Sequence, residues 1–326
     1  MKTKHFYFLG VAVLLLVATQ LFIYSTDLKL EDELHQEQFN MKYGIFAIVK
    51  PENLNFAGEK IPIQSPEIWE RLDNELIRNV YFQSSTMLYF KKANKYFPII
   101  EPILKKYNIP DDFKYLAVIE SGLDNVVSPS GAAGFWQFLK GTALEHGLEV
   151  NKEVDQRYDL EKATVAACEY LQQAYNQFGN WTMAAASYNM GKGGIRKKMT
   201  EQKVTNYYSL HLNSETARYV FRIIAVKEIM QNPKKYGFIF REKDLYTMPS
   251  YKTIEVDSTI ASLSDFAQLH DINYKLLRQF NPWLRSTSLP DKSRKKYILK
   301  IPTDANLMVF DDIEVELDSV SLDSLE

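Results

Sequence analysis

The sequence has little of what several common kinds of function require. It has one cysteine in 326 residues, which excludes an internal disulfide and a zinc site built from cysteines. It has no excess of charge, since 39 Lys and Arg residues balance 41 Asp and Glu residues to a net charge of −2. No long stretch is basic, so binding to a nucleic acid backbone has little support. Outside the N-terminus no run of 18 apolar residues occurs, and we expect the body of the chain to lie outside a bilayer.

The overall composition is that of a globular protein. Hydrophobic residues make up 46% of the chain and charged residues 25%, so disorder, collagen and coiled coil describe the whole chain poorly. At roughly 150 residues per domain, the length predicts about two folded units.

The N-terminal residues 1–26 hold the one long apolar run. Lys2 and Lys4 precede 19 uncharged residues, Phe6 to Tyr24, and acidic residues follow. Basic residues before the run and acidic residues after it predict that the N-terminus lies on the inner side of the membrane and the body on the outer side. We therefore expect a membrane anchor, or alternatively a cleaved export signal, and a location on the periplasmic side of the cell envelope.

The remaining sequence predicts a mainly α protein with a small second domain. The clearest predicted helix covers 159–178, where apolar residues recur every three or four positions and Gly179 follows. Further helices are predicted at 66–80, 84–106, 110–120, 137–146, 181–189 and 214–230, and a β-α-α-β unit has strands at 251–256 and 297–301. We expect an extended connector at 27–64, a helical domain at 65–235 and a linker at 236–250. The β-α-α-β domain is expected at 251–303 and an acidic tail at 304–326.

The sharpest local feature is the predicted helix that ends at Glu120. Six of the seven residues before it are apolar, which indicates a helix buried nearly all round. Burial of a carboxylate favours its neutral form, and a carboxylic acid that keeps its proton near neutral pH can act as a general acid. The alternative is that Glu120 lies at an exposed helix end, closed by Gly122.

Two later segments have residue types that suit a sugar. Gly134 lets the backbone approach a ligand closely, Trp136 offers a flat apolar face, and Gln137 has a donor and acceptors. Tyr188 and Asn189 end an alanine-rich helix before a glycine-rich turn, which could aim two hydrogen-bonding groups into a cleft. As an ordinary loop and an ordinary helix end, both segments would be equally acceptable.

Taken in order, these segments resemble the soluble lytic transglycosylase (SLT) domain, which is similar to goose-type lysozyme. The similar motifs are Glu120-Ser121-Gly122, Gly134-Phe135-Trp136-Gln137, Ser187-Tyr188-Asn189 and Glu215 to Val220. Within the family, the approach to Glu120 resembles the D-type group of membrane-bound lytic murein transglycosylases. Ser187, Phe135 and Met190 depart from the family pattern but remove no reacting group. Residues 254–302 resemble a LysM repeat whose usual glycine-containing turn is replaced at 256–259.

The resemblance implies a lysozyme-like α-helical catalytic domain that cleaves the β-1,4 bond of peptidoglycan and leaves 1,6-anhydro ends. It implies that Glu120 is the single general acid and base, and that the sugars are bound by Ser121, Gln137, Tyr188, Asn189 and Tyr219. It implies no cofactor and no metal, with peptidoglycan strands as the partner and the membrane reached through the N-terminal segment. Two alternatives stay open: a hydrolytic lysozyme-like muramidase with Asp124 as second carboxylate, and a non-catalytic peptidoglycan-binding protein.

Overall fold

The structure is a computed structural model that describes residues 15–17, 19–20, 33–34, 36–37, 44–290, 295–304 and 307. The chain divides into two units, Met1–Val49 and Lys50–Glu326. Most of the expected anchor at 1–26 and most of the expected acidic tail at 304–326 lie outside the described residues. Within the described residues, no helix has the length and apolar character needed to span a bilayer.

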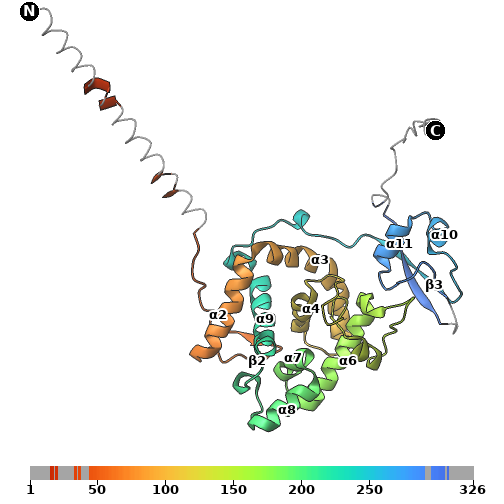
Figure 1. The fold of residues 1–326 in the computed structure, drawn as a ribbon, viewed down its shortest axis with the longest axis horizontal. Helices are drawn as coiled ribbons and strands as arrows, with labels where there is room; N and C mark the ends of the chain where they lie inside the picture. Colours follow the sequence, from red (N-terminus) through yellow and green to blue (C-terminus); the bar gives the residue numbers. More distant parts are fainter. Residues whose placement is uncertain are drawn as a thin grey trace, which may run out of the picture. The chain divides into compact units, whose positions relative to one another are not determined.

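Helices dominate the unit that begins at Lys50 (Figure 1). They are α2 (Pro66–Tyr81), α3 (Gln83–Lys106), α4 (Lys114–Ser121), α5 (Lys140–Glu145), α6 (Leu160–Phe178), α7 (Trp181–Met190), α8 (Lys192–Gln202) and α9 (Ser214–Gln231). Short 3₁₀ turns cover Asp111–Phe113, Gln156–Tyr158, Tyr207–Ser209, Pro233–Tyr236 and Glu242–Asp244. A small antiparallel hairpin, β1 (Asn55–Phe56) and β2 (Glu59–Lys60), precedes α2.

Asparagine and aspartate side chains fix where three of these helices begin. Asp159 accepts a hydrogen bond from the amide of Lys162 at the start of α6, and Asn180 and Asn213 do the same for the first turns of α7 and α9. Each cap satisfies an amide that has no partner within its own helix. The sequence positions of α7 and α9, which hold candidate site residues, therefore follow from local chemistry.

Helix α9 lies at the centre of the helical body, between α2, α4 and α7 (Figure 1). Most of its length is buried, including Tyr219, Val220 and Ile223. A helix that is apolar on nearly every side must be covered by neighbours on nearly every side. Consequently α9 serves as the support against which α4, which carries Glu120, and α7, which carries Asn189, pack.

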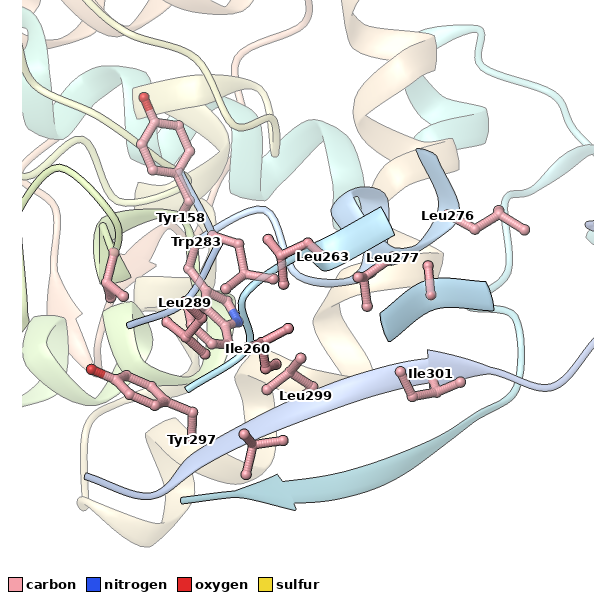
Figure 2. Close-up of a cluster of buried hydrophobic side chains, with 14 of the residues drawn as sticks. Tyr158, Ile260, Leu263, Leu276, Leu277, Trp283, Leu289, Tyr297, Leu299 and Ile301 are labelled. Atoms are coloured by element: carbon pink, nitrogen blue, oxygen red, sulfur yellow. The ribbon is translucent and has the colours of Figure 1, made fainter. Parts of the chain in front are cut away.

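The C-terminal β-α-α-β unit consists of β3 (Tyr251–Val256), α10 (Leu263–Gln268), α11 (Tyr274–Phe280) and β4 (Tyr297–Pro302). The two strands are antiparallel, with Tyr251 opposite Pro302 and Val256 opposite Tyr297. The core of this unit extends into the helical body, because Tyr158 packs into the same cluster (Figure 2). The mainly α fold class with a small β-α-α-β unit is thus confirmed.

Two elements differ from the sequence-based expectation. The predicted connector at 27–64 contains the β1–β2 hairpin, and no helix was predicted over α8. In α8 only Ile195 is buried, so the helix lacks the apolar periodicity from which it could be recognised. The helix predicted at 137–146 is shorter, at Lys140–Glu145, because Gln137 has a left-handed backbone with φ of 49°.

Candidate active site

Glu120 is the next-to-last residue of α4 and faces α9. The hydroxyl of Tyr219 donates a short hydrogen bond to Glu120 Oε1, and the Tyr219 side chain is buried. One turn further along α9, Arg222 donates to the carbonyl oxygen of Ile119 at 2.7 Å. The residues of α4 before Glu120 are buried from Tyr115 onwards, whereas Glu120 itself keeps partial exposure. The carboxyl group therefore lies in a largely enclosed position that still opens to solvent.

This position raises the pKa of Glu120 from its ordinary value of 4.5 to about 7. Burial is the largest cause, since it disfavours the charged form. The hydrogen bond from Tyr219 and the charge of Arg222 act in the opposite direction, and the negative charge of Glu215 raises the pKa further. At neutral pH the carboxyl is thus divided between its acid and its carboxylate forms, and it can both give and take a proton.

Tyr188 and Asn189 stand at the end of α7, beside this carboxyl group. The Tyr188 hydroxyl donates to the carbonyl oxygen of Trp136 at 2.8 Å. The pKa of Tyr188 lies well above 10, first because of burial and second because of the negative charge of Glu120. Asn189 donates to Glu215 Oε1 at 2.9 Å and accepts from the Thr216 hydroxyl at 2.6 Å. These contacts hold α7 and the first turn of α9 together next to Glu120.

Ser121, the last residue of α4, and Gln137 both bond to backbone carbonyl oxygens of the loop that follows α4. The Ser121 hydroxyl donates to the carbonyl oxygen of Phe135 at 2.9 Å. The amide nitrogen of Gln137 donates to the carbonyl oxygens of Gly134 at 2.8 Å and Val126 at 3.0 Å. Within the described residues, neither side chain bonds to Glu120. Of the other five candidates, all of them described, Tyr219 is thus the one whose side chain is hydrogen-bonded to that of Glu120, and Ser121 and Gln137 shape the adjacent loop.

Gly134 has a steric reason to be glycine. A Cβ atom at this position would lie 1.8 Å from the carbonyl oxygen of Arg157, and the backbone φ of 80° is left-handed. The backbone of Arg157 is itself restrained, because its amide donates to Asp155 Oδ1 at 3.1 Å and its guanidinium makes two further hydrogen bonds to the same carboxylate at 3.0 and 2.7 Å. The loop that carries Gln137 can therefore pass this point only without a side chain.

One expectation for this region needs correction. Trp136 does not offer a flat face to a sugar, because its side chain is fully buried and its indole nitrogen donates to Thr164 on α6 at 2.9 Å. It anchors the loop to α6. Asp124, the candidate second carboxylate, forms an ion pair with Lys92 of α3. Lys92 also donates to the carbonyl oxygen of Gly122 at 3.3 Å.

Sequence reasoning included Glu215 in the fourth motif without giving it a role, and it did not name Arg222. Glu215, Tyr219 and Arg222 follow one another at spacings of four and three, so they share a face of α9. That spacing, measured from Tyr219, was the signal that could have identified them. Within the described part of the chain, no group of three His, Cys, Asp or Glu side chains is arranged to hold a metal ion.

Two family models match parts of this chain. Residues 97–210, which include Glu120 and Asn189, match the transglycosylase SLT domain. The chain carries an SLT domain. Residues 252–305 match the soluble lytic transglycosylase C-terminal LysM-like domain. Tyr219 and the rest of α9 lie after the matched SLT range, although they complete the surroundings of Glu120.

Two of the curated relatives of this chain are named as lytic transglycosylases. Over 243 residues the chain is 28% identical to the membrane-bound lytic murein transglycosylase D of Escherichia coli (strain K12), and the match covers 72% of this chain and 52% of that protein. The protein of the same name from the strain CFT073 gives the same figures. The chain thus matches about half the length of these curated relatives. A solved structure, the 70 kDa soluble lytic transglycosylase of Escherichia coli, is similar at 21% identity and a TM-score of 0.38, over 61% of this chain and 40% of that chain.

Proposed function

We propose that this protein is a peptidoglycan lytic transglycosylase. It cleaves the β-1,4 bond between N-acetylmuramic acid and N-acetylglucosamine and leaves a 1,6-anhydro end on the muramic acid. The observation that carries the proposal is the enclosed Glu120 carboxyl, which Tyr219 binds and whose pKa is raised to about 7. The SLT domain match and the names of the relatives support the same reaction class.

The reaction needs one carboxyl group and no water. Protonated Glu120 gives its proton to the oxygen of the glycosidic bond, and the bond between that oxygen and C1 of the muramic acid breaks. The C6 hydroxyl of the same sugar then forms a bond to C1 and passes its proton to the Glu120 carboxylate. Glu120 ends as it began, so a single residue serves as acid and then as base. A pKa near the working pH suits both steps, because neither form is then strongly disfavoured.

The neighbouring residues serve to hold the carboxyl group and the sugar. Tyr219 orients Glu120 and lowers its pKa towards neutrality by hydrogen bonding to the carboxylate. Tyr188 and Asn189 lie beside it on α7 and bind the sugars and the 2-acetamido group. Ser121 and Gln137 keep the loop after α4 in its shape and contribute to substrate binding.

The test is an analysis of the products that the full chain forms from purified sacculi. Mass spectrometry should detect anhydro-muropeptides with the wild-type protein and none with Glu120→Gln, which cannot donate the proton. Products with reducing ends would show hydrolysis instead. Strand binding without any product from the wild-type protein would identify a non-catalytic peptidoglycan-binding protein.

One observation favours the hydrolase as second candidate. The charge of Glu215 raises the pKa of Glu120, so a second carboxylate lies near the first, as a water-using glycosidase requires. Asp124 is a weaker choice, because it is paired with Lys92. If Glu215 activates water, Glu215→Gln should abolish product formation and the wild-type products should have reducing ends. If Glu215 only holds Asn189, the variant should keep anhydro products at a reduced rate.

The proposed location is the periplasmic side of the cell envelope, with residues 1–26 as the anchor or export signal. The basic residues before the apolar run and the acidic residues after it support this orientation. We also propose the domain boundaries given above, with 65–235 as the catalytic domain and 251–303 as the LysM-like domain. N-terminal sequencing of the mature protein distinguishes an anchor from a cleaved signal.

A further inference from the structure

A cavity of about 380 Å³ lies at the junction between the helical body and the β-α-α-β unit. We call it the junction cavity. One wall comes from α3 and the loop after α4, and the opposite wall comes from β3, α11 and β4. Its lining includes Lys95, Tyr96, Phe135, Tyr251, Phe280 and Lys300. Glu120 is not among the lining residues, so the junction cavity is separate from the site of bond cleavage.

The two walls are held together by backbone bonds and a shared core. The amide of Asp155 donates to the carbonyl oxygen of Trp283 at 2.8 Å, and the amide of Arg285 donates to that of Glu153 at 2.7 Å. Tyr158 of the helical body packs in the same apolar cluster as Trp283 (Figure 2). The junction cavity is therefore pre-formed, as small-molecule sites usually are, and its shape does not depend on a mobile hinge.

The chemistry of the walls suits a sugar ring. Tyr96, Tyr251 and Phe280 are aromatic and partly exposed, and the faces of a sugar ring are apolar while its rim is polar. The charged groups of the cavity balance in number: Glu161 is paired with Lys300, and Asp159, which caps α6, and Lys95 are the other two charged residues of the lining. Two cations and two carboxylates do not attract a purely anionic ligand, whereas they offer donors and acceptors to hydroxyl and amide groups.

Lys95 points to a ligand most directly. Its ammonium lies 5.3 Å from the centre of the Tyr96 ring, and within the described residues it makes no hydrogen bond or ion pair. Burial lowers the pKa of Lys95, because removing the ammonium from water disfavours its charged form, and among the described residues no hydrogen-bond acceptor compensates. An oxygen atom of a bound ligand would supply the missing acceptor and recover that cost.

The junction cavity is also close to Glu120 along the chain. Asn125, which lines it, follows Glu120 by five residues, so their Cα atoms lie at most about 18 Å apart. The ring of Phe135 contacts Tyr96 in the cavity wall, with centroids 4.8 Å apart, while the Phe135 carbonyl oxygen accepts the hydrogen bond from Ser121. A polymer that passes Glu120 can therefore reach the cavity with its neighbouring units.

We propose that the junction cavity binds a saccharide unit of the glycan strand away from the cleaved bond, with Tyr96, Tyr251 and Phe280 against the sugar faces and Lys95 donating to a sugar oxygen. The identity of the polymer rests on the proposed function. The cavity acts as a second hold on long strands, and short oligosaccharides that fill only the surroundings of Glu120 do not use it.

The experiment measures the binding of glycan strands freed of their peptide stems to the full chain carrying Glu120→Gln. In that background Lys95→Met should weaken binding about five- to tenfold, somewhat less than a fully buried charge-assisted hydrogen bond would give, because Lys95 is partly exposed. Tyr251→Ala should weaken it similarly. Lys106→Met removes the same charge from an exposed position on the same helix and should leave binding unchanged. Thermal melting shows whether each variant is folded. If Tyr251→Ala does not fold, the binding result for Lys95→Met alone decides the proposal.

Unchanged binding by Lys95→Met overturns the proposal. So does an effect that appears only when the peptide stems are present, because the cavity would then be a peptide site. In the active protein, Lys95→Met should raise KM for long strands without changing the rate on a short oligosaccharide. Failure of the wild-type protein to cleave sacculi would refute the proposed function. The binding assay needs no catalysis, so its result would still decide whether the junction cavity binds the glycan strand.

Discussion

Removal of the Tyr219 hydroxyl gives the most direct test of the role of Glu120. Tyr219→Phe deletes the hydrogen bond to Glu120 Oε1 and keeps the ring that packs in α9. Since that bond stabilises the carboxylate and holds the pKa of Glu120 down, its loss must raise the pKa. A hydrogen bond to a charged group contributes about 1.5–3 kcal/mol, and one pKa unit corresponds to about 1.4 kcal/mol.

A bond of about 1.5–3 kcal/mol corresponds to a shift of about one to two pKa units. We expect about one unit for Glu120, because it keeps partial exposure and water can replace part of the lost bond. Glu120 must be protonated to act first, so kcat/KM of the wild-type protein falls as the pH rises through about 7. In Tyr219→Phe the fall moves to about pH 8. The ratio of kcat/KM at pH 8 to that at pH 6 should therefore rise about fivefold, from about 0.1 to about 0.5.

The assay is the initial rate of anhydro-product formation from solubilised strands between pH 5 and pH 9. A matched control is Tyr236→Phe, because Tyr236 donates to Glu228 Oε1 at 2.9 Å near the other end of α9. This control removes the same kind of hydrogen bond far from Glu120 and should leave the pH profile in place. An alkaline limb that stays at pH 7 in Tyr219→Phe, or moves to lower pH, would refute the reasoning, whatever happens to the absolute rate.

Three further predictions concern stability and follow from single contacts. The pKa of Glu120 is raised from 4.5 to about 7 in the folded protein, so between these pH values the folded state holds a proton that the unfolded state has lost, and the wild-type protein loses stability as the pH rises. Glu120→Gln does not titrate there, so its free energy of unfolding should rise relative to that of the wild type, by at most about 3 kcal/mol. Urea titrations at pH 4.5 and pH 8 measure this difference. An equal difference at both pH values would contradict this. Gly134→Ala should destabilise by several kcal/mol more than Gly131→Ala, since both have left-handed backbones but only the former meets the Arg157 carbonyl oxygen, at 1.8 Å; equal losses would mean that the loop relaxes. Glu59→Ala should lower the free energy of unfolding by about 1–2 kcal/mol and lower kcat, because Glu59 accepts hydrogen bonds from the amides of Trp181 and Thr182 at the start of α7. A loss of stability with kcat unchanged would mean that α7 keeps its position without this cap.

Local patterns accounted for most of the helices and strands. The helix predicted at 159–178 is found at Leu160–Phe178, between a capping Asp159 and Gly179, and β3 is found at the predicted residues 251–256. Both depend on information within a few residues: a cap, a period and a terminating glycine. Helix α8 was not predicted because only Ile195 is buried in it. The β1–β2 hairpin was not predicted because strands of two residues are too short to show an alternating pattern.

The candidate site was predictable in part, for the same reason. The apolar residues before Glu120 indicate an enclosed carboxyl group from sequence alone, and the structure gives the raised pKa that enclosure requires. Tyr219 entered through the family resemblance, because it lies 99 positions away. Trp136 was misinterpreted because an aromatic residue beside glycines fits a ligand wall and a loop anchor equally well. Its bond to Thr164, 28 residues on, decides the question, and no local pattern encodes that bond.

The contacts that set the geometry of the site lie at the opposite ends of its helices. Asp112, just before α4, accepts hydrogen bonds at 2.6 Å from the amide of Ala57 in the hairpin turn and from Lys227 of α9. Glu59 of the same hairpin binds the first amides of α7. At a rise of about 1.5 Å per residue, these anchor points are about 9 to 12 Å from the functional ends of α4, α7 and α9. Each helix acts as a short rigid arm, so the hairpin fixes the relative positions of Glu120, Asn189 and Tyr219 without contacting them.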